Sequence, residues 1–189
     1  NGPEPKPRSV RDLRRAVHAE QRANADLFLL QQSGRIVTEA RSIGSGLSEL
    51  LGLACGYAAM EHGALASVHA GTLTVQVARG GYAPGGTRVS LQDAYAAALQ
   101  PTPRALCRNA DRTVLFLSPG TPLSSEWICP LQAHGRPRGL LLLGSSNPTP
   151  LPSARMLDVL QAWGALAALV LSPQGAGHSV GSQCRGPIS

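Results

Sequence analysis

The stretch from Ser125 to Leu171 decides the fold, and it reads SEWICPLQAHGRPRGLLLLGSSNPTPLPSARMLDVLQAWGALAALVL. Two apolar runs, EWICPL (126–131) and GLLLL (139–143), are separated by the turn-prone AHGRPR. Such runs predict a pair of strands, and Pro130, which has no amide hydrogen, predicts an edge or a bulge in the first. Ser153 is placed to cap a final helix. Its apolar stripe consists of Met156, Leu160, Trp163, Ala167 and Val170.

Two more strands are expected upstream. ALASVHA (64–70) and TLTVQVA (72–78) flank Gly71, and the second alternates apolar with polar residues. This period of two predicts a half-buried strand, and the short connection predicts a hairpin. A helix is expected before them over 47–60, after a break at IGSG (43–46).

The segment after the hairpin is the least regular part of the sequence. Four glycines predict a loop, and Ser90 is placed to cap a short helix over 91–99. Strands are expected at 105–108 and, as a central strand, at 113–117. Helices and strands do not alternate along the chain, which excludes a doubly wound nucleotide-binding fold. The predicted class is α+β (mixed α/β), with a central, mostly antiparallel sheet of five to six strands and helices on both faces.

The N-terminal region has a different character. Residues 1–8 (NGPEPKPR) predict a disordered lead-in, and residues 173–189 a flexible tail. Between 9 and 41 the apolar spacings of three, four and seven predict one long helix, whose early part is too polar for a core. We expect this helix to dimerise with a second copy of the chain. The expected dimer contacts are Val10, Leu13, Val17, Leu27, Leu30 and, from the last helix, Trp163.

Composition excludes several classes of protein. The 189 residues are only 15% charged and 4% aromatic, and the few acids are scattered, which does not suit a carboxylate-driven hydrolase. No run of 18 apolar residues predicts a membrane span, and no signal pattern is present, so a cytoplasmic location is expected. The chain begins at Asn1 rather than Met, so we expect a processed chain or a fragment, with an unidentified protein partner or a fused output domain.

Cysteine and histidine spacing gives no metal or redox motif. Cys55 and Cys129 lie in apolar runs and are expected to be buried, whereas Cys107 lies near Arg104 and Arg108, which would favour its thiolate. The five histidines show neither HxxxH nor HxH spacing, so no metal site is predicted. No GxSxG motif is present, and we expect no enzyme.

The order of elements resembles a GAF domain over residues 27–172. The specific similarity is the closing run: a strand with Cys129-Pro130-Leu131, a Gly-Leu strand ending in Gly144-Ser145, a loop with proline, and an amphipathic helix. The resemblance implies a sensory or regulatory module that binds a small molecule on one sheet face and dimerises through terminal helices. In such a domain the ligand would lie near Tyr82, Asp93, Tyr95, Arg104, Cys107 and Trp127.

The known ligand classes of the family do not match the residues. Bilin-binding members carry Cys-His, but Cys107 is followed by Arg108. The methionine-sulfoxide reductases use a cysteine that GTRVSLQDA (86–94) lacks, and the Asn-Lys-Phe motif of cyclic-nucleotide binders has no counterpart. No cofactor is therefore predicted, and an unknown small ligand is left open.

Two alternatives to a GAF-like regulator follow from other features. Arginines in the N-terminal helix, together with Arg104, Arg108 and Arg112, could bind nucleic acid, although residues 1–26 carry a net charge of only +2 of the total +6. A ligand-free scaffold of the profilin-like roadblock type would also satisfy the order of elements.

Overall fold

The computed structural model describes residues 9–91, 93–100, 106–109 and 123–171. Within these residues one sheet has six strands in the order β3-β2-β1-β6-β5-β4, and every adjacent pair is antiparallel. The strands are β1 (His62–His69), β2 (Thr72–Arg79), β3 (Arg88–Ser90), β4 (Leu106–Asn109), β5 (Ser125–Ala133) and β6 (Arg136–Ser145). The predicted class, with helices on both faces, is confirmed.

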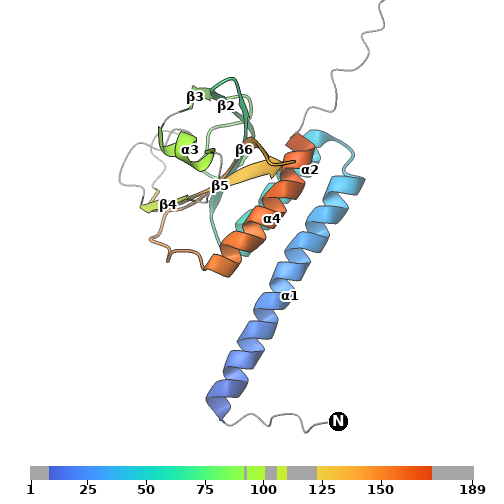
Figure 1. The fold of residues 1–189 in the computed structure, drawn as a ribbon, viewed down its shortest axis with the longest axis vertical. Helices are drawn as coiled ribbons and strands as arrows, with labels where there is room; N and C mark the ends of the chain where they lie inside the picture. The colour runs from blue at the N-terminus through green and yellow to red at the C-terminus, as the bar shows by residue number, and fades with distance from the viewer. Residues whose placement is uncertain (1–8, 92, 101–105, 110–122, 172–189) are drawn as a thin grey trace, which may run out of the picture.

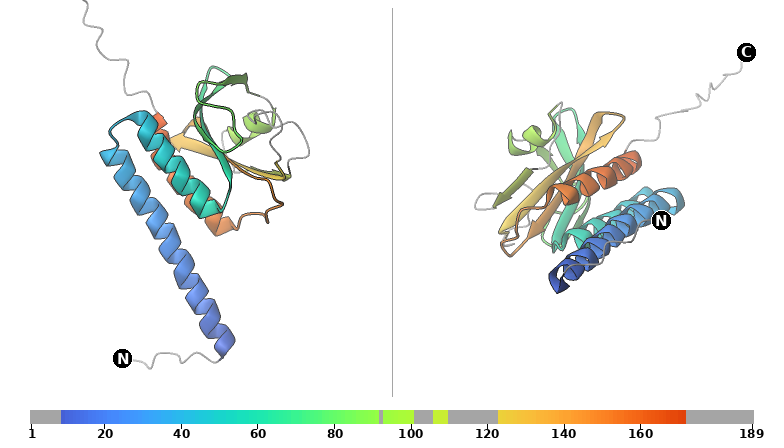
Figure 2. Two further views of the ribbon diagram at one scale, coloured as in Figure 1. Left: turned by 180° about the vertical axis from the view of Figure 1, so that it is seen from behind. Right: turned by 60° about the horizontal axis from the view of Figure 1, so that its bottom comes forward.

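Four helices complete the described fold: α1 (Val10–Glu39), α2 (Ile43–Ala58), α3 (Asp93–Ala98) and α4 (Ala154–Leu171). Helices α2 and α4 cover one face of the sheet, and α1 packs on the outer side of both (Figure 1). The short α3 lies on the opposite face. The first part of α1 extends well beyond the rest of the domain (Figure 2).

The closing run of the sequence forms the centre of the sheet. A two-residue turn at His134 and Gly135, both at positive φ, joins β5 to β6. Gly139 allows β6 to approach β1, because a Cβ there would collide with the carbonyl oxygen of Ala66. The bulge expected near Pro130 follows it closely, because the β5–β6 register shifts between Leu131 and Gln132. The residues before β4 that would face Pro130 from its other side lie outside the described residues, so the expected edge is not tested.

Side chains alternate along β5 and divide the core into two clusters. Trp127, Cys129 and Leu131 face the helices α2 and α4. Glu126 and Ile128 face the other side, which α3 partly covers. The fold therefore has a helix-covered face and an α3 face, and a residue's place in the alternation decides to which one it belongs.

Two expected boundaries are wrong. IGSG (43–46) is the first turn of α2 rather than a break, because the Oγ of Ser42 accepts a hydrogen bond from the backbone N–H of Ser45 at 3.2 Å. Residues Arg88–Ser90 form β3, so Ser90 ends a strand and does not cap α3, which begins at Asp93. The strand expected at 113–117, the lead-in 1–8 and the tail 173–189 lie outside the described residues.

Helix α4 is long and apolar enough, by length and composition only, to span a bilayer, with a mean hydropathy of 1.4. Its residues Leu160, Trp163 and Ala167 are nevertheless fully buried in the core that it forms with the sheet, α1 and α2. This packing is that of a core helix within a domain.

Candidate functional site

A buried carboxylate marks the α3 face of the sheet. Glu126 on β5 is fully buried, although charged side chains are rarely buried without partners. Its Oε1 accepts a hydrogen bond from the hydroxyl of Tyr82 at 2.9 Å and lies 3.4 Å from the hydroxyl of Tyr95. We call Tyr82, Tyr95 and Glu126 the tyrosine–glutamate cluster.

Three separate elements bring this cluster together. Tyr82 follows β2, Tyr95 belongs to α3, and Glu126 lies on β5. Gly144 on β6 leaves the space that Tyr82 needs, because a Cβ there would lie 3.1 Å from the Tyr82 hydroxyl and 2.5 Å from a methyl of Leu123. The cluster therefore places two hydroxyls and a carboxylate together on the α3 face of the sheet.

The six predicted ligand residues do not share one place. Tyr82 and Tyr95 are together on the α3 face, but Trp127 lies in the cluster on the helix-covered face. Cys107 is on β4, where its backbone pairs with Trp127, and Asp93 is the first residue of α3; their side chains, like all of Arg104, lie outside the described part. The sequence patterns did not single out Glu126, which is the one charged residue in the apolar run EWICPL.

A second polar cluster closes one end of the sheet. Glu61, just before β1, accepts from the backbone N–H of Ser146 at 3.0 Å and from the amide of Asn147 at 3.2 Å. These hydrogen bonds, that of the Ser146 N–H first, hold the pKa of the Glu61 carboxyl below its ordinary value of 4.5. The neighbouring His62 has its Nε2 2.9 Å from the Oγ of Ser146.

The hydrogen bonds of His62 argue against catalysis by this serine. The backbone N–H of Gly81 donates to Nδ1 of His62 at 3.1 Å, so Nδ1 must carry a lone pair. The neutral ring then carries its proton on Nε2 and donates to Ser146. A base that activates Ser146 would need a free lone pair there, so the arrangement holds β1, β6 and the residues after β2 together rather than preparing a nucleophile.

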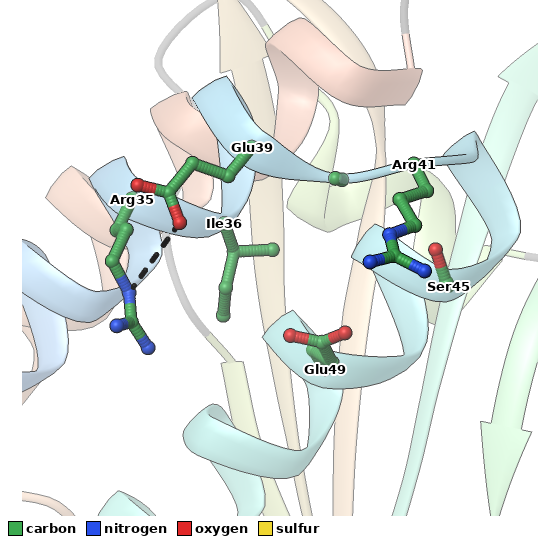
Figure 3. Close-up of a pocket in the computed structure, with 7 residues that line it drawn as sticks. Arg35, Ile36, Glu39, Arg41, Ser45 and Glu49 are labelled. Atoms are coloured by element: carbon green, nitrogen blue, oxygen red, sulfur yellow. Dashed lines mark ion pairs between the residues drawn. The ribbon is translucent and has the colours of Figure 1, made fainter.

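A hollow of about 380 Å³ lies where α1 meets α2 (Figure 3). Arg35, Glu39, Arg41 and Glu49 give its lining balanced charge, and Arg35 and Glu39 are more than half exposed. Figure 3 shows Arg41 and Glu49 directed into the same space from the α1–α2 connection and from α2. An open hollow with balanced charge selects no ligand class, and we assign none to it.

The predicted dimer contacts fall into two groups. Val10, Leu13, Val17 and Leu27 are on the outside of α1, between 44% and 71% exposed. Leu30 is half-buried and packs against the core, and Trp163 is fully buried in it. Trp163 therefore cannot contact a second copy, since the residues that would have to part are those of the domain's own core.

Solved structures of other proteins share this architecture. No protein-family model matches the sequence, and no curated protein is similar to it. The GAF domain of a putative sensor histidine kinase from Pseudomonas syringae pv. tomato superposes with a TM-score of 0.60, covering 82% of this chain and 93% of that one at 22% identity. The chain has the fold of a GAF domain.

Other structures give the GAF fold the same support. The GAF domain of a phosphoenolpyruvate-protein phosphotransferase from Acinetobacter has a TM-score of 0.67 at 12% identity, covering 82% of this chain and 96% of that one. A phycocyanobilin-bound GAF domain of a cyanobacterial phytochrome has a TM-score of 0.62 at 10% identity, covering 77% and 93%. The GAF fold predicted from the closing run is thus confirmed.

Proposed function

We propose that this chain is a non-catalytic regulatory module of cytoplasmic signalling that dimerises through α1 and passes its signal to a protein partner or a fused output domain. The observation that carries the proposal is the apolar stripe formed by Val10, Leu13, Val17 and Leu27, exposed on a helix that extends beyond its own domain. A second copy of the stripe is the surface that would remove these side chains from water. Similar folds in a sensor kinase and in phytochromes support the regulatory role.

The tyrosine–glutamate cluster is the proposed input site. It lies on the α3 face, away from α1, and offers hydroxyls and a carboxylate to a small polar ligand rather than a hydrophobic pocket. We propose no bilin ligand of the kind bound by the phytochrome domains, because Cys107 is followed by Arg108 rather than His.

Output would pass through β5 and α4 to α1. Glu126 and Trp127 are adjacent on β5 but face opposite sides of the sheet, and Trp127 belongs to the core that α4 completes. From α4, Arg155 Nε donates to the carboxylate of Asp26 on α1 at 2.7 Å. A ligand that binds more tightly to one arrangement of β5, α4 and α1 would shift the equilibrium between two arrangements of the dimer.

Native mass spectrometry of the chain purified from its source tests both parts of the proposal. We expect the mass of a dimer, and a retained small molecule would identify the input. A monomer at all concentrations would contradict the dimer. A dimer that retains no molecule, and whose tyrosine–glutamate cluster gives no response in a ligand screen, would leave assembly as the function and contradict the input site.

One observation favours a second candidate, a nucleic-acid contact. Arg11, Arg14, Arg15 and Arg22 are all exposed on α1, outside the apolar stripe. Binding to a DNA duplex that weakens steeply with salt would favour this candidate, since each neutralised phosphate adds about −0.9 to the slope of log K against log salt. Absence of binding at about 50 mM salt, near the low end of the usual salt range, would reject it.

A further inference from the structure

The exposed stripe of α1 follows the repeat of a two-stranded coiled coil. Spacings of three and four residues alternate without interruption through Val10, Leu13, Val17, Glu20, Asn24 and Leu27. Val10, Val17 and Asn24 share one of the two core positions of the heptad, and Leu13, Glu20 and Leu27 share the other. Valine at the first position with leucine at the second favours parallel dimers, and a single asparagine at the first position fixes register. We call these six residues the seam.

The domain lies on the other side of the helix from the seam. The fully buried contacts of α1 with the domain are Leu29, Ser33 and Ile36. At 3.6 residues per turn these positions point nearly opposite to the mean direction of the seam. Two helices joined along the seam would thus carry their domains on opposite outer sides, where the domains cannot collide.

We propose that α1 pairs with α1 of a second copy in parallel and in register, so that each seam residue faces its own equivalent and Asn24 faces Asn24. This inference rests on the proposed dimer and adds its orientation and register. A two-fold axis along the seam makes the surface complementary to itself, as a symmetric dimer requires.

The residues that flank the seam favour a second copy as the occupant. In a parallel pair, Ala23 of one helix lies beside Phe28 of the other, which covers an exposed aromatic ring. Ala16 lies beside Gln21 in the same way, so no like charges meet at these flanking positions. The exposed Arg11, Arg15 and Arg22 occupy outward positions of the heptad and do not oppose the pairing.

Glu20 is the seam residue that weakens the dimer. In the parallel register it faces Glu20 of the other copy, and like charges placed together are unfavourable. Together, Glu20 and Asn24 make the dimer less stable than one with only apolar residues in the seam. A reversible dimer suits a module whose arrangement a ligand must shift by a modest free energy.

Disulfide trapping in the full chain distinguishes the orientations. The background carries Cys107→Ser and Cys184→Ser; Cys55 and Cys129 remain, because both are buried and burial raises the pKa of the Cys55 thiol to about 11. Val10→Cys and Leu27→Cys are each oxidised alone and as a mixture. A disulfide needs Cα atoms within about 7 Å, so only facing positions are trapped.

Parallel pairing in register predicts that each single variant forms a covalent dimer, while the outward control Arg15→Cys does not. An antiparallel seam would instead join the Val10→Cys chain to the Leu27→Cys chain in the mixture and trap neither variant alone, because antiparallel helices place the first core position of one helix opposite the second core position of the other. Sedimentation of the reduced samples separates the two claims. A monomer overturns the proposed dimer, whereas a dimer trapped in the antiparallel pattern, or not trapped at all, overturns only its orientation.

Glu20→Leu adds a test in the opposite direction. In the parallel seam it removes the facing carboxylates and is expected to tighten dimerisation by at least about tenfold, which corresponds to about 1.4 kcal/mol. Ala25→Leu adds a leucine at an outward, exposed position of the same helix and serves as the control. Equal effects of the two variants would contradict the seam.

Discussion

Among single residues, Glu61 gives the clearest dependence of the protein's stability on pH. The Ser146 N–H and the neighbouring donors lower the pKa of its carboxyl in the folded state, so the unfolded state binds more protons in acid. This part of the stability is present above the unfolded pKa and is lost as the pH falls through the folded pKa. We expect the free energy of unfolding of Glu61→Gln to fall less steeply below about pH 4.5 than that of the wild type.

Urea unfolding between neutral pH and acid pH measures this difference. Glu49→Gln, which removes an exposed carboxylate from α2, is the matched control and is expected to follow the wild type. If Glu61→Gln shows the same acid dependence as the wild type and the control, the hydrogen bonds to Glu61 do not stabilise the fold.

The hydroxyl of Tyr82 is expected to stabilise the folded state. Its hydroxyl donates to the buried Glu126, and a hydrogen bond to a charged group contributes about 1.5–3 kcal/mol. Tyr82→Phe is therefore expected to lower the free energy of unfolding by about that amount. Tyr95→Phe should cost less, because its hydroxyl lies at 3.4 Å from the same oxygen. Thermal and urea denaturation measure both losses of stability. Equal stability of Tyr82→Phe and the wild type would contradict the prediction.

At the scale of elements, Gly139 sets the contact between β1 and β6. Gly139→Ala places a Cβ against the carbonyl oxygen of Ala66, and overpacking of this kind costs about 1–3 kcal/mol. Gly34→Ala makes the same chemical change in the second half of α1, where no atom beyond its chain neighbours and the helix's own backbone lies within 4 Å of the new Cβ, and is expected to stabilise by about 0.5–1 kcal/mol. Opposite signs in urea denaturation are the expected result, and a stabilising Gly139→Ala would contradict the close strand contact.

Asp26 ties three helices together where α1 leaves the domain. Its two carboxylate oxygens accept from the Tyr57 hydroxyl of α2 at 2.6 Å and from Arg155 of α4 at 2.7 Å. Burial, together with the hydrogen bond to the Asp26 carboxylate and its charge, raises the pKa of Tyr57 above its ordinary range. Asp26 and Arg155 hold α1 against the domain, so a movement of α4 would change this contact.

We expect Asp26→Ala to loosen α1 without unfolding the sheet. Hydrogen–deuterium exchange should become faster over about residues 23–37, while β1, β5 and β6 keep their protection, because strand pairing does not depend on this contact. Arg35→Ala removes the exposed pair with Glu39 on the same helix and should change little. Unchanged exchange in Asp26→Ala would show that apolar packing alone holds α1.

Local patterns predicted most of these elements, and the exceptions have physical causes. The turn with His134 and Gly135, the β5–β6 pair and the N-cap at Ser9 depend on neighbouring residues and were predictable. The start of α2 was not, because Gly46 suggests a break but lies in a helix, where its missing Cβ leaves room for Ala40. The three residues of β3 pair with β2 and give too short a pattern to detect.

The candidate site was predictable only in part for a related reason. Tyr82 and Tyr95 could be placed near one sheet face from the resemblance to GAF domains. Trp127 could not be assigned to a face, because the run EWICPL is apolar on both sides and its alternation becomes visible only in the sheet. Glu126 could have been found because burying a charge is costly unless it has partners, which makes an acid inside an apolar strand unusual.

At the scale of the whole molecule, α1 divides the chain into a folded domain and an extension. The second half of α1 belongs to the core through Leu29 and Ile36, and the first half has no contact of that kind among the described residues. A helix in this position can connect the state of the domain to that of a second copy. The proposed function therefore depends most on whether the first half of α1 forms a dimer.

Sedimentation equilibrium of the full chain over a range of concentrations tests this most directly. The wild type is expected to be a reversible dimer. Leu13→Ser with Val17→Ser should raise the dissociation constant by more than about 100-fold, since burying each such side chain contributes about 1.5–3 kcal/mol. Arg11→Ser with Arg15→Ser, the outward control, should leave it unchanged. A wild-type monomer at every concentration, or a dimer that both double variants weaken equally, would contradict the account.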